Sequence, residues 1–293
     1  MRREKGSRLR RRQKQFALVA LSPVMIYMGV FVILPVIMAF INSFLDTSTR
    51  AFVGIANYRE FLFEDPRGPA SIRNTFVYAL IRIPATIIIG FFIANALDRI
   101  RYARGTMIFG FFAPYVTNMV AFSAVFLYLY ANTGLFNTLL RSLNLPTMSF
   151  TRSLTQALPS IALMDAWKHI GFDVVVFLAA LKAVPKTFYE AARIDGASGF
   201  QMVRFIKIPL LRPTILYLLV MIFIWTMQVF EPIYVMTGGG PLNATRTIVF
   251  SIYQAGFRQF RLGYASAIAY IEFILIMIVT LIQLRVGRTT WSY

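Results

Sequence analysis

Apolar residues form long blocks along this chain, and polar segments separate the blocks. Six blocks are roughly 20 residues long, which is the length that a helix needs to cross the hydrocarbon core of a bilayer. They cover Ala17–Phe40, Thr75–Leu97, Thr106–Leu129, Ile161–Leu181, Ile215–Met236 and Ala265–Leu284. The pattern predicts an all-α membrane protein with six transmembrane helices.

Two features of these blocks need interpretation. Pro35, Pro84 and Pro114 fall inside predicted spans, where neighbouring helices can satisfy the backbone groups that proline leaves free. The first block follows a basic run, as the apolar part of a signal peptide does. It is longer than such a part and shows no clear small-x-small cleavage site, so we interpret it as a true span.

The composition supports a membrane protein. Of 293 residues, 58% are hydrophobic and 14% are charged, whereas a soluble domain carries about 25% charged residues. The chain has no cysteine, so it has neither a disulfide framework nor thiolate chemistry. Its single histidine, His169, is not spaced with other ligands as in a zinc site, so we expect no metal centre.

The net charge of +18 would suggest nucleic acid in a soluble protein. Here, nineteen of the 30 basic residues lie in the N-terminal tail, the loops after the second and fourth blocks, and the C-terminus, and nine lie on the opposite side. Basic residues tend to stay cytoplasmic, so both termini are expected inside. Residues 1–15 are interpreted as a basic cytoplasmic tail facing lipid headgroups rather than nucleic acid, and residues 16–293 as one six-helix transmembrane domain.

The polar segment 182–212 lies between the fourth and fifth blocks, on the predicted cytoplasmic side. Thr187–Glu190 and Ser198–Gln201 each fit the capping-box pattern that begins a helix. Gly196 can adopt the left-handed conformation that ends one. We predict two short helices with a bend at Gly196, the second ending at Pro209. Two interpretations are open: a helix lying on headgroups, or a docking surface whose small Ala191 and Ala192 allow close approach.

Several motifs resemble one transporter family. Glu190-Ala191-Ala192, Asp195-Gly196-Ala197 and Ile208-Pro209-Leu210 resemble the EAA signature of bacterial ABC importer membrane subunits, more narrowly the maltose-type permeases for sugars and glycerol phosphate. Isoleucine at 208 replaces the family's usual leucine. Thr237–Pro241, Leu262–Ala267 and Val53–Tyr58 are also similar to family patterns, and the resemblance extends from Leu21 onward.

The resemblance implies a type I ABC importer permease fold in a bacterial or archaeal cytoplasmic membrane. It implies that the segment 182–212 is a coupling loop that docks on a cytoplasmic ATPase dimer through Glu190, Ala191, Ala192, Asp195 and Gly196. The sequence contains no Gly-Lys-Ser/Thr, so it has no Walker A loop. ATP and Mg²⁺ would therefore be bound by the partner ATPase, and this chain would carry no catalytic residue. The other implied partners are a second homologous permease subunit, an extracytoplasmic solute-binding protein and a sugar, oligosaccharide or polyol substrate.

Ionisable residues inside spans usually face a bundle interior or an aqueous cavity. Asp165, Lys168 and His169 are expected near the outer end of the fourth span, mainly at the interface and with a local ion pair. The resemblance places substrate contacts in two stretches, Trp167–Val174 and Trp225–Glu231. The candidate pathway residues there are Trp167, Gly171, Asp173, Val174, Trp225, Thr226, Gln228 and Glu231. The alternative is that these polar groups hydrogen-bond between helices.

Two other function classes are alternatives to an ATP-driven importer. An ion-coupled secondary transporter would use Asp173, Glu231 and Glu272 as coupling carboxylates. Such transporters often contain inverted repeats, and we find no convincing repeat between the halves of this chain. A membrane-embedded enzyme would need a nucleophile with a base or a metal centre, and the sequence offers no such group of residues. The family resemblance, together with the absence of these features from the sequence, therefore favours the importer subunit.

Overall fold

The computed structural model describes residues 2–100 and 102–287, and within them the structure is helical. The α-helices are α1 (Arg2–Met28), α2 (Leu34–Ser43), α3 (Ala56–Arg59), α4 (Arg67–Arg99), α5 (Arg104–Val116), α6 (Met119–Leu129), α7 (Leu135–Ser142), α8 (Ala157–Ala183), α9 (Lys186–Ile194), α10 (Gly199–Gln201), α11 (Ile208–Leu210), α12 (Arg212–Met227), α13 (Glu231–Met236), α14 (Ile248–Tyr253) and α15 (Leu262–Val286). Four π-helical segments join some of them: Gly29–Ile33, Glu60–Glu64, Met202–Lys207 and Gln254–Arg258.

Three helices are long and apolar enough to cross a membrane by themselves. They are Gln15–Ser43, which joins most of α1 to α2, and α4 and α15. Two bent helix pairs, α5 with α6 and Gly199–Leu210 with α12, bring the number of candidate spans to as many as five. The chain is thus an all-helical membrane protein. The helix α8, at 27 residues, is long enough to span but carries Asp165, Lys168, Asp173 and Lys182.

The third apolar block is not one straight helix, as its pattern suggested. It breaks between α5 and α6, whose axes differ by 98°. Pro114 lies near the end of α5, and its carbonyl oxygen accepts hydrogen bonds from the backbone N–H and the hydroxyl of Thr117. Asn118 then caps α6, because its side chain accepts from the N–H groups of Val120 and Ala121. Local side-chain bonds therefore end one helix and begin the next.

The fifth block is also interrupted. The helix α12 ends at Met227, and α13 begins at Glu231 with Pro232 in its first turn. Proline suits that position because the first helical N–H groups have no partner within the helix. Gln228, Val229 and Phe230 consequently lie outside both helices, in the middle of the apolar block Ile215–Met236.

Helices that pack against one another bury three apolar clusters. One joins α4, α8 and α12 around Phe91, Phe177 and Leu218. A second joins α8 to α6 and α13, and a third packs α15 against α12 and α14. The helices α5 and α8 approach closely at Gly171, where any side chain would collide with the carbonyl group of Phe111.

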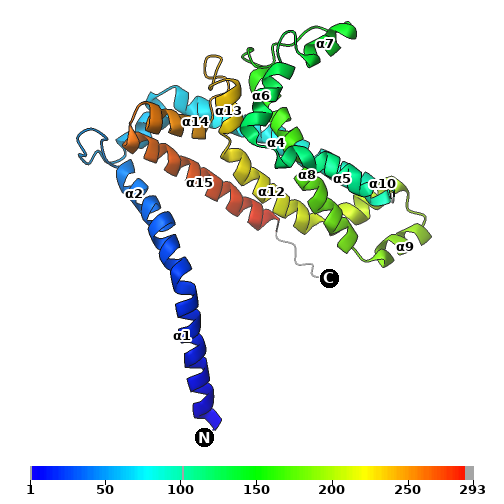
Figure 1. The fold of residues 1–293 in the computed structure, drawn as a ribbon, viewed down its shortest axis with the longest axis horizontal. Helices are drawn as coiled ribbons and strands as arrows, with labels where there is room; N and C mark the ends of the chain where they lie inside the picture. The colour runs from blue at the N-terminus through cyan, green and yellow to red at the C-terminus, as the bar shows by residue number, and fades with distance from the viewer. Residues whose placement is uncertain (1, 101, 288–293) are drawn as a thin grey trace.

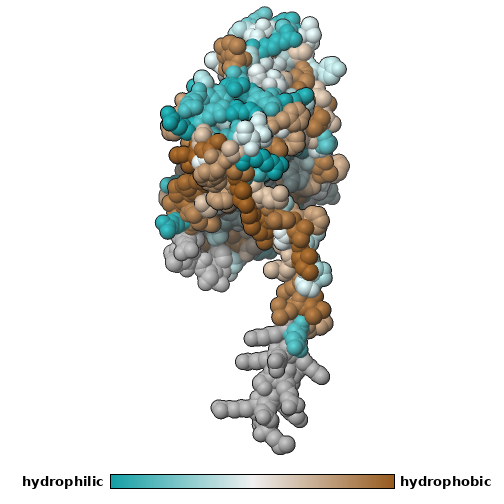
Figure 2. Space-filling view, turned by 90° about the vertical axis from the view of Figure 1, so that its left-hand side faces the viewer, coloured by the Kyte–Doolittle hydropathy of each residue, from teal (hydrophilic) through white to brown (hydrophobic). Residues whose placement is uncertain are grey.

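The first helix stands apart from this bundle. Figure 1 shows α1 extending away from the rest of the molecule, and no residue of its most apolar window is buried. In Figure 2 the upper part of the visible face is largely hydrophilic, and a hydrophobic band below it continues onto α1. The side chains of residues 1–12 and Lys14 lie outside the described part, as do Arg101 and residues 288–293, so the structure does not test the predicted basic tail or C-terminal charges.

Candidate functional site

The segment between α8 and α12 folds as two short helices joined at Gly196. Gly196 has φ of +74°, which favours glycine. Ser198 and Gln201 form the predicted capping box: the Ser198 N–H donates to Gln201 Oε1 at 2.7 Å, and the Gln201 N–H donates to Ser198 Oγ at 3.3 Å. The predicted bend and second capping box are thus confirmed.

One local prediction for this segment is wrong. The helix α9 begins at Lys186, directly after Pro185, and has no side-chain cap. Thr187 lies inside its first turn, so it cannot form the predicted capping box with Glu190. The predicted end of the second helix holds to within one residue, because the helical run that begins at Gly199 ends at Leu210, directly after Pro209.

The predicted coupling residues differ in accessibility. Glu190, Ala191, Asp195 and Gly196 are exposed, whereas Ala192 is buried. Large apolar side chains surround them at the surface: Ile194 is 86% exposed, Phe200 76% and Phe188 43%. The loop therefore presents an apolar surface edged with charges rather than a uniformly polar one.

One buried lysine connects this loop to the bundle. Lys207 Nζ donates to Asn95 Oδ1 at 2.6 Å and lies 3.6 Å from Asp98 Oδ2, near the end of α4. It also lies over the ring of Tyr189 on α9, 5.5 Å from the centroid. The contacts bring together two parts of the loop and the cytoplasmic end that we predict for α4.

A buried ion pair lies among α4, α8 and α12. Arg82 Nε is 2.9 Å from Asp165 Oδ2, although it is not aligned for a hydrogen bond, so the contact is mainly ionic. Tyr78 donates to Asp165 Oδ2 at 2.8 Å, and Arg82 donates to the Thr226 hydroxyl at 2.7 Å. His169 Nδ1 lies 2.9 Å from Asp165 Oδ1. The group joins three helices through charge and hydrogen bonds.

This geometry corrects the predicted position of two charges. Asp165 and Lys168 are 3% and 4% exposed, so they are buried within the bundle rather than interfacial. Lys168 donates from Nζ to the Tyr115 carbonyl oxygen at 3.0 Å. Asp165 and His169, one turn apart, are in contact at 2.9 Å as the expected local pair requires, and the contact is ionic only when His169 is protonated.

The eight candidate pathway residues do not form one lining surface in the isolated chain. Trp167, Gln228 and Glu231 are exposed, and Trp225 is half-buried. The others are buried between helices: Gly171, Asp173, Val174 and Thr226. Gln228 lies at the break between α12 and α13, where the backbone is irregular. Irregular backbone at membrane depth is found where it is buried in protein or lines a cavity.

The structure adds two aromatic residues that the sequence analysis missed. Phe172 lies edge-on to Trp225, with ring centroids 5.4 Å apart. On its other side, Phe172 stacks on Tyr115, also at 5.4 Å. The rings connect α5, α8 and α12 beside the candidate residues. Phe172 lies within the stretch Trp167–Val174, so the sequence could have indicated it as a candidate pathway residue. Nothing in the sequence linked Tyr115 to that stretch.

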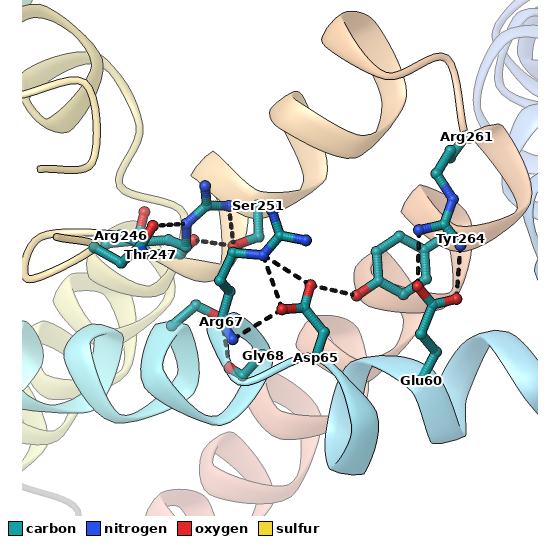
Figure 3. A network of polar contacts seen from close by, with 11 residues as sticks. Glu60, Asp65, Arg67, Gly68, Arg246, Thr247, Ser251, Arg261 and Tyr264 are labelled. Atoms are coloured by element: carbon teal, nitrogen blue, oxygen red, sulfur yellow. Dashed lines mark hydrogen bonds and ion pairs between the residues drawn. The ribbon is translucent and has the colours of Figure 1, made fainter.

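A polar network joins the start of α4 to the start of α15 (Figure 3). Arg261 donates to both carboxylate oxygens of Glu60, at 2.7 and 2.6 Å. Arg67 Nε donates to Asp65 at 2.8 Å, and Tyr264 donates to the other oxygen of Asp65 at 3.2 Å. Burial raises the pKa of Asp65, but the hydrogen bonds from Arg67 outweigh it and hold that pKa below the usual value. The stabilisation by ionised Asp65 is therefore present at neutral pH and is lost as the pH falls through its pKa in the folded protein.

Proteins of known family are similar in sequence to this chain over nearly its whole length. The trehalose/maltose transport system permease protein MalF of Thermococcus litoralis is 31% identical, over 96% of this chain and 97% of the relative. The sulfoquinovosyl glycerol transport system permease protein SmoG of Agrobacterium fabrum is 30% identical, over 93% of this chain and 90% of the relative. The chain belongs to the carbohydrate-uptake family of ABC transporter permeases. It is the permease subunit of a carbohydrate-uptake ABC transporter, not the ATPase.

The permease also resembles a solved structure in its fold. A bacterial alginate ABC transporter, in complex with an alginate pentasaccharide-bound periplasmic protein, contains a chain that matches with a TM-score of 0.80. The two are 23% identical, and the match covers 94% of this permease and 95% of that chain. No family model matches the sequence. The fold likeness supports a multi-pass membrane permease.

Proposed function

We propose that this permease forms half of a carbohydrate translocation pathway and pairs with a second homologous permease subunit. The exposed α1 supports this pairing, because large apolar surfaces on a protein usually mark contacts with another protein or with lipid. Five candidate spans together with α8 would give six transmembrane helices, as in the predicted type I importer fold. Residues 16–293 would form this transmembrane domain, and residues 1–15 a cytoplasmic tail at the headgroups.

The loop 182–212 would couple the pathway to an ATPase dimer that binds ATP and Mg²⁺. The observation that carries this proposal is the Gly196 bend between two helices, with Phe188, Ile194 and Phe200 exposed around the EAA residues. Lys207 then connects this surface to α4. ATP binding would favour one state of the pathway only if the ATPase contacts the loop differently in the two states.

An extracytoplasmic binding protein would deliver the substrate to the outer side. The alginate transporter's complex with a pentasaccharide-bound periplasmic protein supports this partner. The relatives' names include disaccharide and glycoside transport systems, which supports a sugar, oligosaccharide or related polyol as the substrate. The test is to purify the complex from its native host and measure which sugars the co-purified binding protein binds. A complex that contains no ATPase subunit would contradict the proposal.

Reporter fusions are expected to show that the loops containing Arg50 and Arg193 lie on opposite sides of the membrane. A fusion after Arg193 should be cytoplasmic, and a fusion after Arg50 should be extracytoplasmic, because basic residues are concentrated on the side of Arg193. Paired reporters that are active only inside or only outside the cell measure this directly. Cytoplasmic location of both fusions would contradict the assignment of the first two spans.

Replacing Gln228 with leucine is expected to raise the KM for uptake about fivefold or to change sugar selectivity. Gln228 is an exposed amide at the α12–α13 break, and a lost hydrogen bond to a sugar hydroxyl has an effect of about 1 kcal/mol. Uptake into proteoliposomes checks this, with Tyr217→Leu, at an exposed residue of α12, as the control. Normal assembly and unchanged KM for both variants would remove Gln228 from the pathway.

A further inference from the structure

A cavity opens at the end of α6, beside the loop that follows α13. Its volume is about 940 Å³, and its lining includes Tyr128, Asn132, Thr133, Thr151, Arg152 and Thr237. This volume is within the range of small-molecule binding sites. The topology proposed above places the cavity on the extracytoplasmic side, outside the candidate pathway residues.

The walls of the cavity are fixed by a buried asparagine. Asn137 is fully buried, and its amide nitrogen donates to the carbonyl oxygens of Ala131 and Met148, at 3.2 and 3.0 Å. The Met148 N–H donates back to Asn137 Oδ1 at 2.8 Å. Asn137 therefore holds the chain after α6 and the irregular segment before α8 at a fixed separation. Such preorganisation lowers the entropy cost of binding a ligand.

An aromatic pair forms one wall. Tyr130 and Phe150 stack with their ring centroids 4.5 Å apart and their planes within 12°. The Tyr130 hydroxyl donates to the Ser160 carbonyl oxygen at 3.0 Å, which ties the stack to α8. Beside this fixed pair, Tyr128 is 81% exposed, so its ring is available to a ligand.

The polar groups of the lining are those that recognise sugars. Asn132 and Thr133 supply an amide and a hydroxyl, each of which can both donate and accept hydrogen bonds as sugar hydroxyls do. The exposed Tyr128 ring offers an apolar face for the C–H face of a sugar ring. The sequence contains no aspartate or glutamate between Ala121 and Met164, which argues against a cation as the ligand. Arg152 adds a planar guanidinium group, whose N–H groups can donate to several oxygen atoms of a sugar at once.

One short helix connects the cavity to the candidate pathway. The helix α13 begins at Glu231, a candidate pathway residue, and ends at Met236, which lines the cavity. At 1.5 Å per residue, this helix spans roughly 9 Å. The two regions are therefore close enough for one sugar chain to contact both.

We propose that this cavity is an outer subsite that binds the trailing sugar units of an oligosaccharide as it enters the permease. The inference rests on the proposed function, because it assumes a carbohydrate substrate, and it adds a second binding region outside the membrane pathway. The outer subsite increases the affinity for oligosaccharides and not for single sugars, because only a chain reaches both regions.

The test compares Tyr128→Ala with Phe52→Ala, a matched change at an exposed aromatic residue on the same predicted side that does not line the cavity. Each variant is assembled with its permease partner and ATPase in nanodiscs, without the binding protein. Calorimetric titration uses maltotriose and arabinotriose, and glucose and arabinose as their single-sugar counterparts. Tyr128→Ala is expected to raise the Kd of the trisaccharide that binds about tenfold, and to leave the Kd of the single sugar unchanged. Phe52→Ala should change neither.

The outcomes separate the subsite from the proposed function. Equal trisaccharide affinity in Tyr128→Ala and wild type, or no sugar bound by the wild-type complex, overturns the subsite. In a separate titration of the binding protein against the same nanodiscs, a loss of binding-protein affinity in Tyr128→Ala without loss of sugar affinity shows instead that the cavity is a protein-docking surface, and this also overturns the subsite. A complex that binds trisaccharide through Tyr128 but shows no ATP-dependent uptake supports the subsite and contradicts the proposed function.

Discussion

Replacing Arg82 with methionine is expected to lower the free energy of unfolding of the permease by about 3–5 kcal/mol, because removal of one partner from a buried ion pair leaves the other charge unpaired. Arg82 and Asp165 are 2% and 3% exposed, so water cannot replace the lost partner. Tyr78 and His169 would still contact Asp165, but a neutral donor does not balance the charge, and His169 balances it only when it is protonated. The measurement is reversible unfolding in mixed detergent micelles.

Two further variants make this result specific. Arg73→Met alters an exposed arginine on the same helix, α4, and should change stability by less than about 0.5 kcal/mol. Adding Asp165→Asn to Arg82→Met removes the unpaired charge and should recover most of the loss. If the double variant is no more stable than Arg82→Met alone, the ion pair does not hold α4 and α8 together in the way that its geometry indicates.

Replacing Gly196 with valine is expected to weaken ATPase association about tenfold. Gly196 has φ of +74° and nothing within 4 Å of the position of an added side chain, so the effect comes from backbone strain and not from a steric clash. A left-handed β-branched residue costs about 1–2 kcal/mol, and 1.4 kcal/mol corresponds to a tenfold change in affinity. Relieving that strain would change the angle between α9 and the helix after Ser198.

The matched control is Gly196→Asn, since asparagine tolerates the left-handed conformation far better than valine. Pull-down of the ATPase and the ratio of sugar imported to ATP hydrolysed would be measured for both variants. Gly196→Val should insert, pair with the second permease and lose ATPase affinity, and Gly196→Asn should resemble the wild type. If both variants bind the ATPase and import sugar per ATP as the wild type does, the loop lies on lipid headgroups and does not dock on the ATPase.

The local chemistry of the loop could be predicted from sequence because its determinants are neighbours in the chain. Gly196 permits the bend by itself, and Ser198 finds its capping partner three residues later. The same rule failed at Thr187, because Pro185 starts the helix earlier and places Thr187 inside it. The breaks at Thr117–Asn118 and Gln228–Phe230 were missed for a related reason: hydropathy averages over a block and does not register the local caps and prolines that interrupt it.

The buried charges could not be placed from sequence because their partners are distant in the chain. Arg82 and Asp165 are 83 positions apart by number, and only the packing of α4 against α8 brings them together. A charged residue in an apolar block can lie at an interface, line a pathway or pair within the bundle, and periodicity does not distinguish these positions. The same holds for Asp173, which is 1% exposed beside Gly90 of α4, so its predicted role in the pathway depends on how the bundle opens.

Separate ATPase subunits are expected to drive sugar through this permease. The most direct measurement is sugar uptake into proteoliposomes that contain the whole complex, with the binding protein outside the vesicles, ATP inside and an ionophore that removes proton and sodium gradients. Uptake should continue with the ionophore, stop without internal ATP and stop without the binding protein. Uptake that persists without ATP and is abolished by the ionophore would contradict the claim and indicate an ion-coupled carrier that uses carboxylates such as Asp173, Glu231 and Glu272.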